Sequence, residues 1–231
     1  MSYAVRAARL HLVGWPLTLM WPWLILASSW VVNWVIFAAL RSNDVDSGFT
    51  GGLLSVYICQ FVVFTWLFTR GFRFAINLSV TRRAYYVGSW MVVLGVSLTN
   101  GIALTVFEAV EDATGGWGVD LPFFGVPFMV TGNVLTQTLV YAVPFVLFGG
   151  AAAVYGTVNA RWGANGVFTA VLATVVLPGL VIALIAWRDW WVPIGEWFAD
   201  ASTAALFALW PGLAAVVCAC GGFLLARRAA F

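Results

Sequence analysis

Six apolar runs follow one another along the chain, and short polar segments separate them. A helix needs about 20 residues to cross the hydrocarbon core of a bilayer, and each run is about that long or longer. The runs predict transmembrane helices over residues 17–40, 51–69, 87–110, 127–155, 167–187 and 203–226. Pro144 lies inside the fourth run, so we expect a bend there. The predicted fold class is therefore all-α, a polytopic membrane protein with six transmembrane helices in one domain.

Composition agrees with this pattern. Of the 231 residues, 63% are apolar and only 9% are charged, which is too little polar surface for a soluble globule. Residues 1–14 place Arg6, Arg9 and His11 among apolar residues, so they predict a helix that lies in the membrane interface. A cleaved signal peptide is the competing interpretation, but the apolar run that follows is too long for one.

Charge is strongly segregated under this six-helix interpretation. If the helices alternate in direction, nine of the eleven arginines lie on one side, and Arg41 and Arg188 lie on the other with all nine acids. Positive charge favours the cytoplasmic side, so both termini are predicted to be cytoplasmic. A wrong number of helices would mix the two sets of charges.

Several kinds of chemistry are excluded for the chain itself. It contains no lysine, which the phosphate-binding loop of nucleotide hydrolases requires. His11 is the single histidine, so a buried serine and histidine pair is not expected. Cys218 and Cys220 stand two apart on a predicted helix and face different directions, which argues against metal binding. We expect no catalytic residue, no metal, no cofactor bound by this chain and no nucleic-acid partner.

Acids gather at the far end of the third run, at Glu108, Glu111 and Asp112, just before Gly115 and Gly116. This pattern is typical of a solvated boundary outside the membrane. A catalytic acid and base pair is the less favoured alternative.

Polar residues inside the apolar runs are candidates for a transport path. Asn133, Gln137 and Tyr141 recur at a spacing of four, which places them on one helical face, and Asn33 and Asn100 could face them. Hydrogen bonding between packed helices is the alternative role. The centres of the runs carry no charged residue, which disfavours an ion-driven carrier.

Residues 70–86, RGFRFAINLSVTRRAYY, form the one long basic segment between two apolar runs. Arg73 and Asn77 fall on one face of a short predicted helix, and either Ser79 or Thr81 is suited to cap the helix that follows. Such a segment could dock a partner protein, or it could be a basic loop that binds anionic lipid.

The sequence FRFAINLSVTRRAYYVGSW, between the second and third runs, resembles the corresponding segment of ABC type-2 transporter permeases, six-helix subunits without an ATPase domain. The resemblance implies a dimer with a second copy or a paralogue and with two separate ABC ATPase subunits, which bind ATP and Mg. It implies that residues 71–80 are a cytoplasmic coupling helix, that residues 1–14 are an interfacial elbow helix, and that residues 190–200 are outer helices. The implied ATPase contacts are Phe72, Arg73, Phe74, Ile76, Asn77, Leu78, Arg82 and Arg83.

The expected function is that of a permease subunit in an ATP-driven exporter of a drug-like, peptide or lipid-like compound. By the same resemblance, we expect it in the bacterial cytoplasmic membrane, in contact with membrane lipids. Two alternatives stay open: an ATP-independent carrier or channel, and a non-transporting immunity or assembly protein.

Overall fold

The computed structural model describes residues 15–42, 48–71 and 81–228, and these residues form helices and connecting loops without any strand. The elements are α2 (Trp15–Ser42), α3 (Leu54–Trp66), η1 (Leu67–Gly71), α5 (Arg82–Ala113), η2 (Gly116–Asp120), α6 (Val134–Trp187), α7 (Trp191–Asp200), η3 (Ala205–Leu209) and α8 (Trp210–Arg228). The all-α class is confirmed. The interfacial helix expected over residues 1–14 and most of the expected coupling helix lie outside the described residues.

Within the described residues, five helices are long and apolar enough to cross a membrane. They cover Met20–Ser42, Leu54–Gly71, Arg83–Ala113, Val134–Trp187 and Ala205–Leu225. These helices support the prediction of a membrane protein with several spanning helices.

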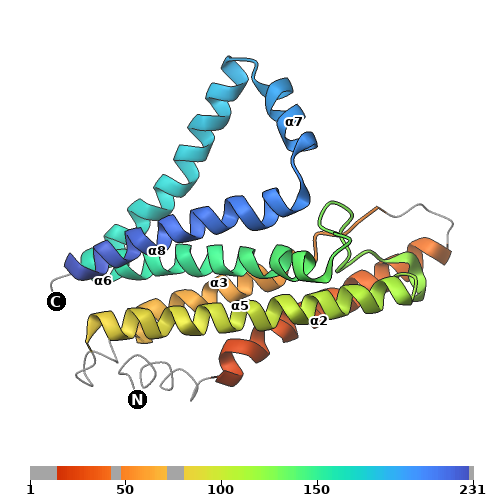
Figure 1. Ribbon diagram of the computed structural model, residues 1–231, viewed down its shortest axis with the longest axis horizontal. Helices are drawn as coiled ribbons and strands as arrows, with labels where there is room; N and C mark the ends of the chain where they lie inside the picture. The colour runs from red at the N-terminus through yellow and green to blue at the C-terminus, as the bar shows by residue number, and fades with distance from the viewer. Residues whose placement is uncertain (1–14, 43–47, 72–80, 229–231) are drawn as a thin grey trace.

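The longest helix, α6, differs from the expected pair of spans over residues 127–155 and 167–187. It runs for 54 residues from Val134, and residues 121–133 form a loop instead of helix. Pro122 and Pro127 disfavour helix in that loop. The helix changes direction at Gly163, where φ is 64° and ψ is −154°, and not at Pro144 (Figure 1).

Helices α2, α3, α5, α8 and the first half of α6 lie side by side and form the bundle (Figure 1). Its core contains Val56, Tyr141 and Phe145, which are fully buried. Small residues let the helices approach closely: a side chain at Gly101 of α5 would meet the Cβ of Ala142 in α6 at 2.6 Å.

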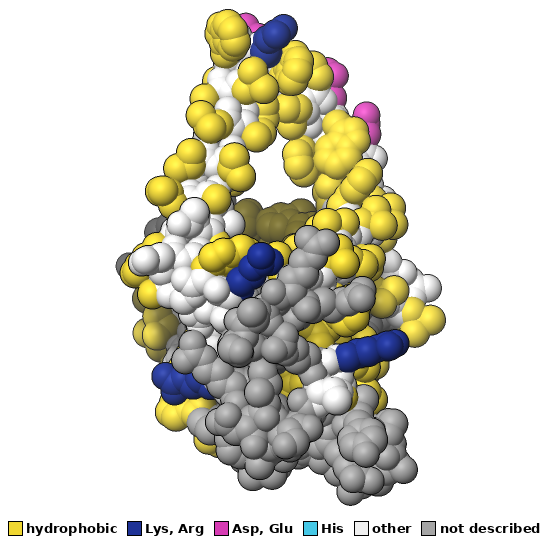
Figure 2. Space-filling model, turned by 90° about the vertical axis from the view of Figure 1, so that its left-hand side faces the viewer, with side chains coloured by type: hydrophobic (Ala, Val, Ile, Leu, Met, Phe, Trp, Pro, Cys, Tyr) yellow, Lys and Arg dark blue, Asp and Glu magenta, His cyan; other side chains and the backbone are white. Residues whose placement is uncertain are grey.

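The second half of α6 leaves the bundle together with α7, and we refer to residues 164–200 as the arm. The arm projects from the bundle and turns back at its tip, so that α6, α7 and α8 surround an opening (Figures 1 and 2). Its large apolar side chains are exposed, with Phe168 at 71% and Trp187 at 80%. The arm therefore presents an apolar surface on several sides.

Charged residues separate along the bundle. Arg70 lies in η1, Arg83 in the first turn of α5, and Arg161 just before the bend of α6. These parts of the elements meet at one end of the bundle, which we name the basic end (Figure 1). Glu108 and Glu111 lie near the opposite end of α5. The assignment of these two ends to two sides of a membrane stays a prediction.

Candidate functional site

A buried cluster of polar side chains lies inside the bundle, where three helices meet. The indole N–H of Trp23 in α2 donates to Oδ1 of Asn100 in α5 over 3.1 Å, and Nδ2 of Asn100 donates to Oε1 of Gln60 in α3 over 3.4 Å. Gln60 and Asn100 are fully buried, and Ser97, one turn before Asn100, is almost so. We name Trp23, Gln60, Ser97 and Asn100 the polar cluster.

The polar cluster has unused hydrogen-bonding capacity. Within the described part of the chain, Nε2 of Gln60 and the hydroxyl of Ser97 have no hydrogen-bond partner. Buried polar groups are nearly always paired, and an unpaired one costs about 1–3 kcal/mol. Each of these two groups therefore has the capacity for one further hydrogen bond.

Asn100 is one of the residues predicted from the sequence to line a path, whereas Gln60 is not. A glutamine within the apolar run 51–69 was the signal, because a polar side chain in a membrane span normally faces protein or water. Asn33, also a candidate for the path, belongs to a different contact. Its Oδ1 accepts from the hydroxyl of Thr50 over 2.6 Å, and its Nδ2 donates to the carbonyl of Ser29 over 2.8 Å. Asn33 thus joins α2 to the segment before α3.

The other three path candidates, Asn133, Gln137 and Tyr141, form hydrogen bonds with the loop before α6 or with the first turn of α6. Asn133 is the N-cap of α6 and accepts from the N–H of Leu135 over 2.8 Å, so it lies outside the helix. Gln137 accepts from the N–H of Thr131 over 2.6 Å. The hydroxyl of Tyr141 donates to the carbonyl of Phe124 over 2.8 Å. Their role in lining a transport path stays a prediction.

Residues 114–133 connect the end of α5 to the start of α6 and fold over the end of the bundle opposite the basic end. We name them the loop cap, and Glu111 is the residue that forms most hydrogen bonds with it. The Glu111 carboxylate accepts from the indole N–H of Trp117 over 2.8 Å. It also accepts from three consecutive backbone N–H groups, those of Phe123, Phe124 and Gly125, over 3.1, 3.0 and 2.7 Å. Successive N–H groups of this kind stabilise an anion.

Glu111 is only 4% exposed, so the expectation that it belongs to a solvated boundary was wrong. The carboxylate is buried because it accepts hydrogen bonds from the backbone N–H groups of residues 123–125, which would otherwise bind water. Its neighbour Asp112 is exposed, as expected. Glu108, Asp112 and Asp120 line an adjacent polar cavity of about 290 Å³. Across the described residues, no group of three or more His, Cys, Asp or Glu side chains is placed to hold a metal ion.

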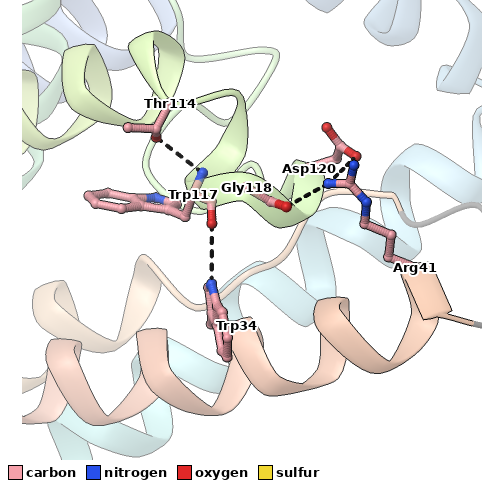
Figure 3. A network of polar contacts seen from close by, with 6 residues as sticks. All are labelled: Trp34, Arg41, Thr114, Trp117, Gly118 and Asp120. Carbon is pink, nitrogen blue, oxygen red and sulfur yellow. Dashed lines mark hydrogen bonds and ion pairs between the residues drawn. The ribbon is translucent and has the colours of Figure 1, made fainter.

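The loop cap is also attached to α2 (Figure 3). Arg41 forms an ion pair with Asp120 over 3.2 Å and donates to the carbonyl of Gly118 over 2.6 Å. The indole N–H of Trp34 donates to the carbonyl of Trp117 over 3.4 Å. Arg41 and Asp120 are both exposed, so their ion pair contributes little to stability.

At the basic end, the described residues bring the two ends of the 72–80 segment together. The hydroxyl of Tyr85, in the first turn of α5, donates to the carbonyl of Leu67 in η1 over 2.6 Å. Thr81 accepts from the N–H of Ala84 over 3.3 Å and is the N-cap of α5, which confirms one of the two expected caps. Helix α5 therefore begins at Arg82, as a cap at Thr81 predicts, and it includes the five residues before the apolar run expected from residue 87.

Most of the expected ATPase contacts lie outside the described residues: Phe72, Arg73, Phe74, Ile76, Asn77 and Leu78. Arg82 begins α5, but its side chain is also outside them. The Arg83 side chain is exposed. It is thus available to a partner or to lipid headgroups.

Comparison of the chain with family models, curated proteins and solved structures found no match. No family is therefore shown for the chain, and the resemblance of residues 72–90 to ABC type-2 permeases stays a prediction. The geometry that bears on function consists of the polar cluster, the loop cap and the basic end.

Proposed function

We propose that the chain is the membrane-spanning permease subunit of an ABC type-2 exporter, active as a dimer with two separate ATPase subunits. One observation carries the proposal. The segment that resembles a coupling helix leaves η1 and enters α5 at the basic end of the bundle, where Tyr85 and Leu67 join the two elements. A force applied to that segment would thus reach two spanning helices together.

The proposed topology has six spans, with α6 counted as two that are divided at Gly163. Arg70, Arg83 and Arg161 then lie on the cytoplasmic side, and Glu108 and Glu111 lie on the outer side. The 54 residues of α6 are about 80 Å of helix at 1.5 Å per residue. This is more than twice the hydrocarbon thickness of about 30 Å, which supports two crossings.

In the proposed mechanism, ATP and Mg bind to the partner ATPases, and this chain performs no hydrolysis. Closure of the ATPases moves residues 72–80, and η1 and α5 move with them. Gln60 lies in α3, which continues into η1, and Asn100 lies in α5. Motion of these helices relative to each other would open or close the polar cluster. The cargo is a drug-like, peptide or lipid-like compound whose polar group pairs with Gln60 and Asn100.

The test is charge reversal at the basic segment. We expect Arg73→Glu combined with Arg82→Glu and Arg83→Glu to abolish co-purification of an ATPase encoded beside this gene, because acidic groups on the partner would be repelled. Membrane insertion should be unchanged. Arg41→Glu, at the opposite end of the bundle, is the matched control and should leave the complex intact. Persistence of both the complex and its ATP-dependent transport in the triple variant would contradict the assignment.

A second candidate function is an ATP-independent carrier or channel. It rests on the same polar cluster, because the unpaired Nε2 of Gln60 and hydroxyl of Ser97 lie within a single chain and need no second subunit to form a polar site. Proteoliposomes that contain only this chain separate the candidates. A carrier moves substrate without ATPase and without ATP, whereas the permease subunit is inactive alone. A non-transporting protein is inactive with the ATPase as well.

A further inference from the structure

A small cavity lies between α2, α5 and the loop cap, and aromatic side chains form most of its wall. We name it the aromatic cavity, and its volume is about 160 Å³. In the described part of the chain, its aliphatic lining residues are Leu26 and Ala27 of α2. The other lining residues all carry aromatic rings: Trp23 and Trp30 of α2, Phe107 of α5, and Trp117 and Phe124 of the loop cap. The cavity is smaller than the roughly 300 Å³ at which drug-sized sites begin, so it suits a small occupant.

The rings pack against one another and so maintain the shape of the aromatic cavity. Trp23 lies against Phe107 with the ring centres 5.7 Å apart, and Trp30 meets Trp117 edge to face at 5.2 Å. Phe124 stacks on Phe107 at 5.1 Å. The electron-rich face of an aromatic ring attracts a cation, and an indole does so most strongly. A wall of indole and phenyl rings therefore favours a cation that has an apolar surface.

A negative charge lies directly beside this wall. The indole N–H of Trp117 and the backbone N–H of Phe124 both donate to the buried carboxylate of Glu111. Within the described residues, the ion pair of Arg41 with Asp120 is the only one, so no basic side chain there neutralises Glu111. No charged side chain of those residues lines the cavity itself. Because charges interact more strongly away from water, charge complementarity favours a positive occupant.

We propose that the aromatic cavity binds a quaternary ammonium group. The lining side chains offer no hydrogen-bond acceptor, so the N–H donors of a primary ammonium or a guanidinium group would be left unpaired. A quaternary ammonium group has no N–H and presents only methyl and methylene groups to the rings. Both a free quaternary ammonium compound and the headgroup of a choline lipid have this chemistry. Binding at this site does not depend on the proposed transport function.

Isothermal titration of the full chain, purified in a detergent without choline, tests the proposal. The probes are choline and its carbon isostere, in which an uncharged tert-butyl group replaces the trimethylammonium group, so they share one shape and differ in charge. We expect choline to bind at least about ten-fold more tightly, because the attraction between a cation and an aromatic ring is strongest away from water. Equal binding of the two probes would overturn the proposal, and so would a failure of choline to bind.

Trp30→Leu tests the rings without removing a hydrogen bond, since the indole N–H of Trp30 has no partner in the part of the chain that the structure describes. This variant should reduce the preference for choline over the isostere several-fold. Trp21→Leu is the matched control, because Trp21 lies on the same helix with a half-exposed ring and does not line the cavity. An equal reduction in Trp21→Leu, or none in Trp30→Leu, would contradict the assignment.

A third variant tests the cavity itself. Ala27→Phe should fill it and abolish the binding of both probes, and unchanged choline binding in this variant would overturn the proposal. Titration in bilayer discs of phosphatidylcholine or phosphatidylethanolamine then distinguishes the two sources of the group. Weaker choline binding in phosphatidylcholine would identify the lipid headgroup as the occupant, whereas equal binding in both would identify a free compound, and either result supports a quaternary ammonium site.

Discussion

At the scale of single residues, Glu111 is the side chain on which the loop cap most depends. Replacement by alanine leaves the backbone N–H groups of Phe123, Phe124 and Gly125 and the indole of Trp117 without their acceptor. Each buried unpaired donor costs about 1–3 kcal/mol. We therefore expect Glu111→Ala to lower the melting temperature of the purified protein clearly and to expose the loop cap to proteolysis.

Two exposed acids of the same region serve as controls for this prediction. Asp112→Asn alters the next residue of α5, and Asp120→Asn removes the ion pair with Arg41. An exposed ion pair contributes about 0–1 kcal/mol, so both variants should melt close to the unchanged protein. If the melting temperature of the Glu111→Ala variant equals that of these controls, the carboxylate does not stabilise the loop cap.

The roles of Glu111 and Gln60 could be predicted only in part from the sequence. Gln60 is conspicuous in an apolar run, but its pairing with Asn100 depends on how α3 and α5 pack, which spacing within one helix does not reveal. Glu111 stands among exposed acids and glycines. It is buried because the chain folds back, so that the backbone N–H groups from Phe123 on, 12 residues later in the sequence, reach its carboxylate. Local sequence patterns do not predict such a contact between distant parts of the chain.

At the scale of elements, the contact between α5 and α6 depends on the absence of a side chain at Gly101. A methyl group there would lie 2.6 Å from the Cβ of Ala142 and 2.8 Å from the carbonyl oxygen of Thr138. Because backbone and Cβ atoms cannot rotate away, we expect Gly101→Ala to separate the helices and to destabilise the fold by about 1–3 kcal/mol. Thermal unfolding measures this, and Gly95→Ala on the same helix, which meets nothing within 4 Å, is the control.

The bend of α6 depends on Gly163 for a different reason. There is space for a side chain, but a φ of 64° with a ψ of −154° is a combination that is essentially confined to glycine. Gly163→Ala should therefore straighten α6 and move the arm. The distance between spin labels at Val175 in the arm and Val216 in α8 measures this change. Gly179→Ala, where φ is ordinary and space is free, should leave the distance unchanged.

Element positions were predicted better than element boundaries. Apolar length alone located the spanning helices, since about 20 apolar residues have few alternatives in a membrane protein. The turn expected around Arg161 became a bend within a helix, because no proline interrupts residues 145–177 and a single glycine suffices to change direction. The loop at residues 121–133 was expected to be partly helical, but side chains of α5 and α6 stabilise it instead.

At the scale of the whole molecule, the bundle and the arm differ in how they are stabilised. The bundle buries its own core, whereas the arm exposes Phe168, Val175 and Trp187 on a helix that leaves the other spans. In a membrane, lipid or a second copy of the chain would cover such a surface. The side of the membrane on which the arm tip lies therefore gives the most direct test of the proposed six-span topology.

The side of the membrane on which Asp189 lies decides between one and two crossings by α6. If α6 crosses twice, Asp189 and Asp120 share the outer side and Arg161 is cytoplasmic. If α6 crosses only once, Asp189 and Asp120 are on opposite sides. We expect single cysteines at positions 120 and 189, introduced after replacement of Cys59, Cys218 and Cys220, to react with an impermeant maleimide on intact cells. A cysteine at position 161 should react only after permeabilisation, and protection of position 189 on intact cells would contradict the six-span topology, because α6 would then deliver it to the cytoplasmic side.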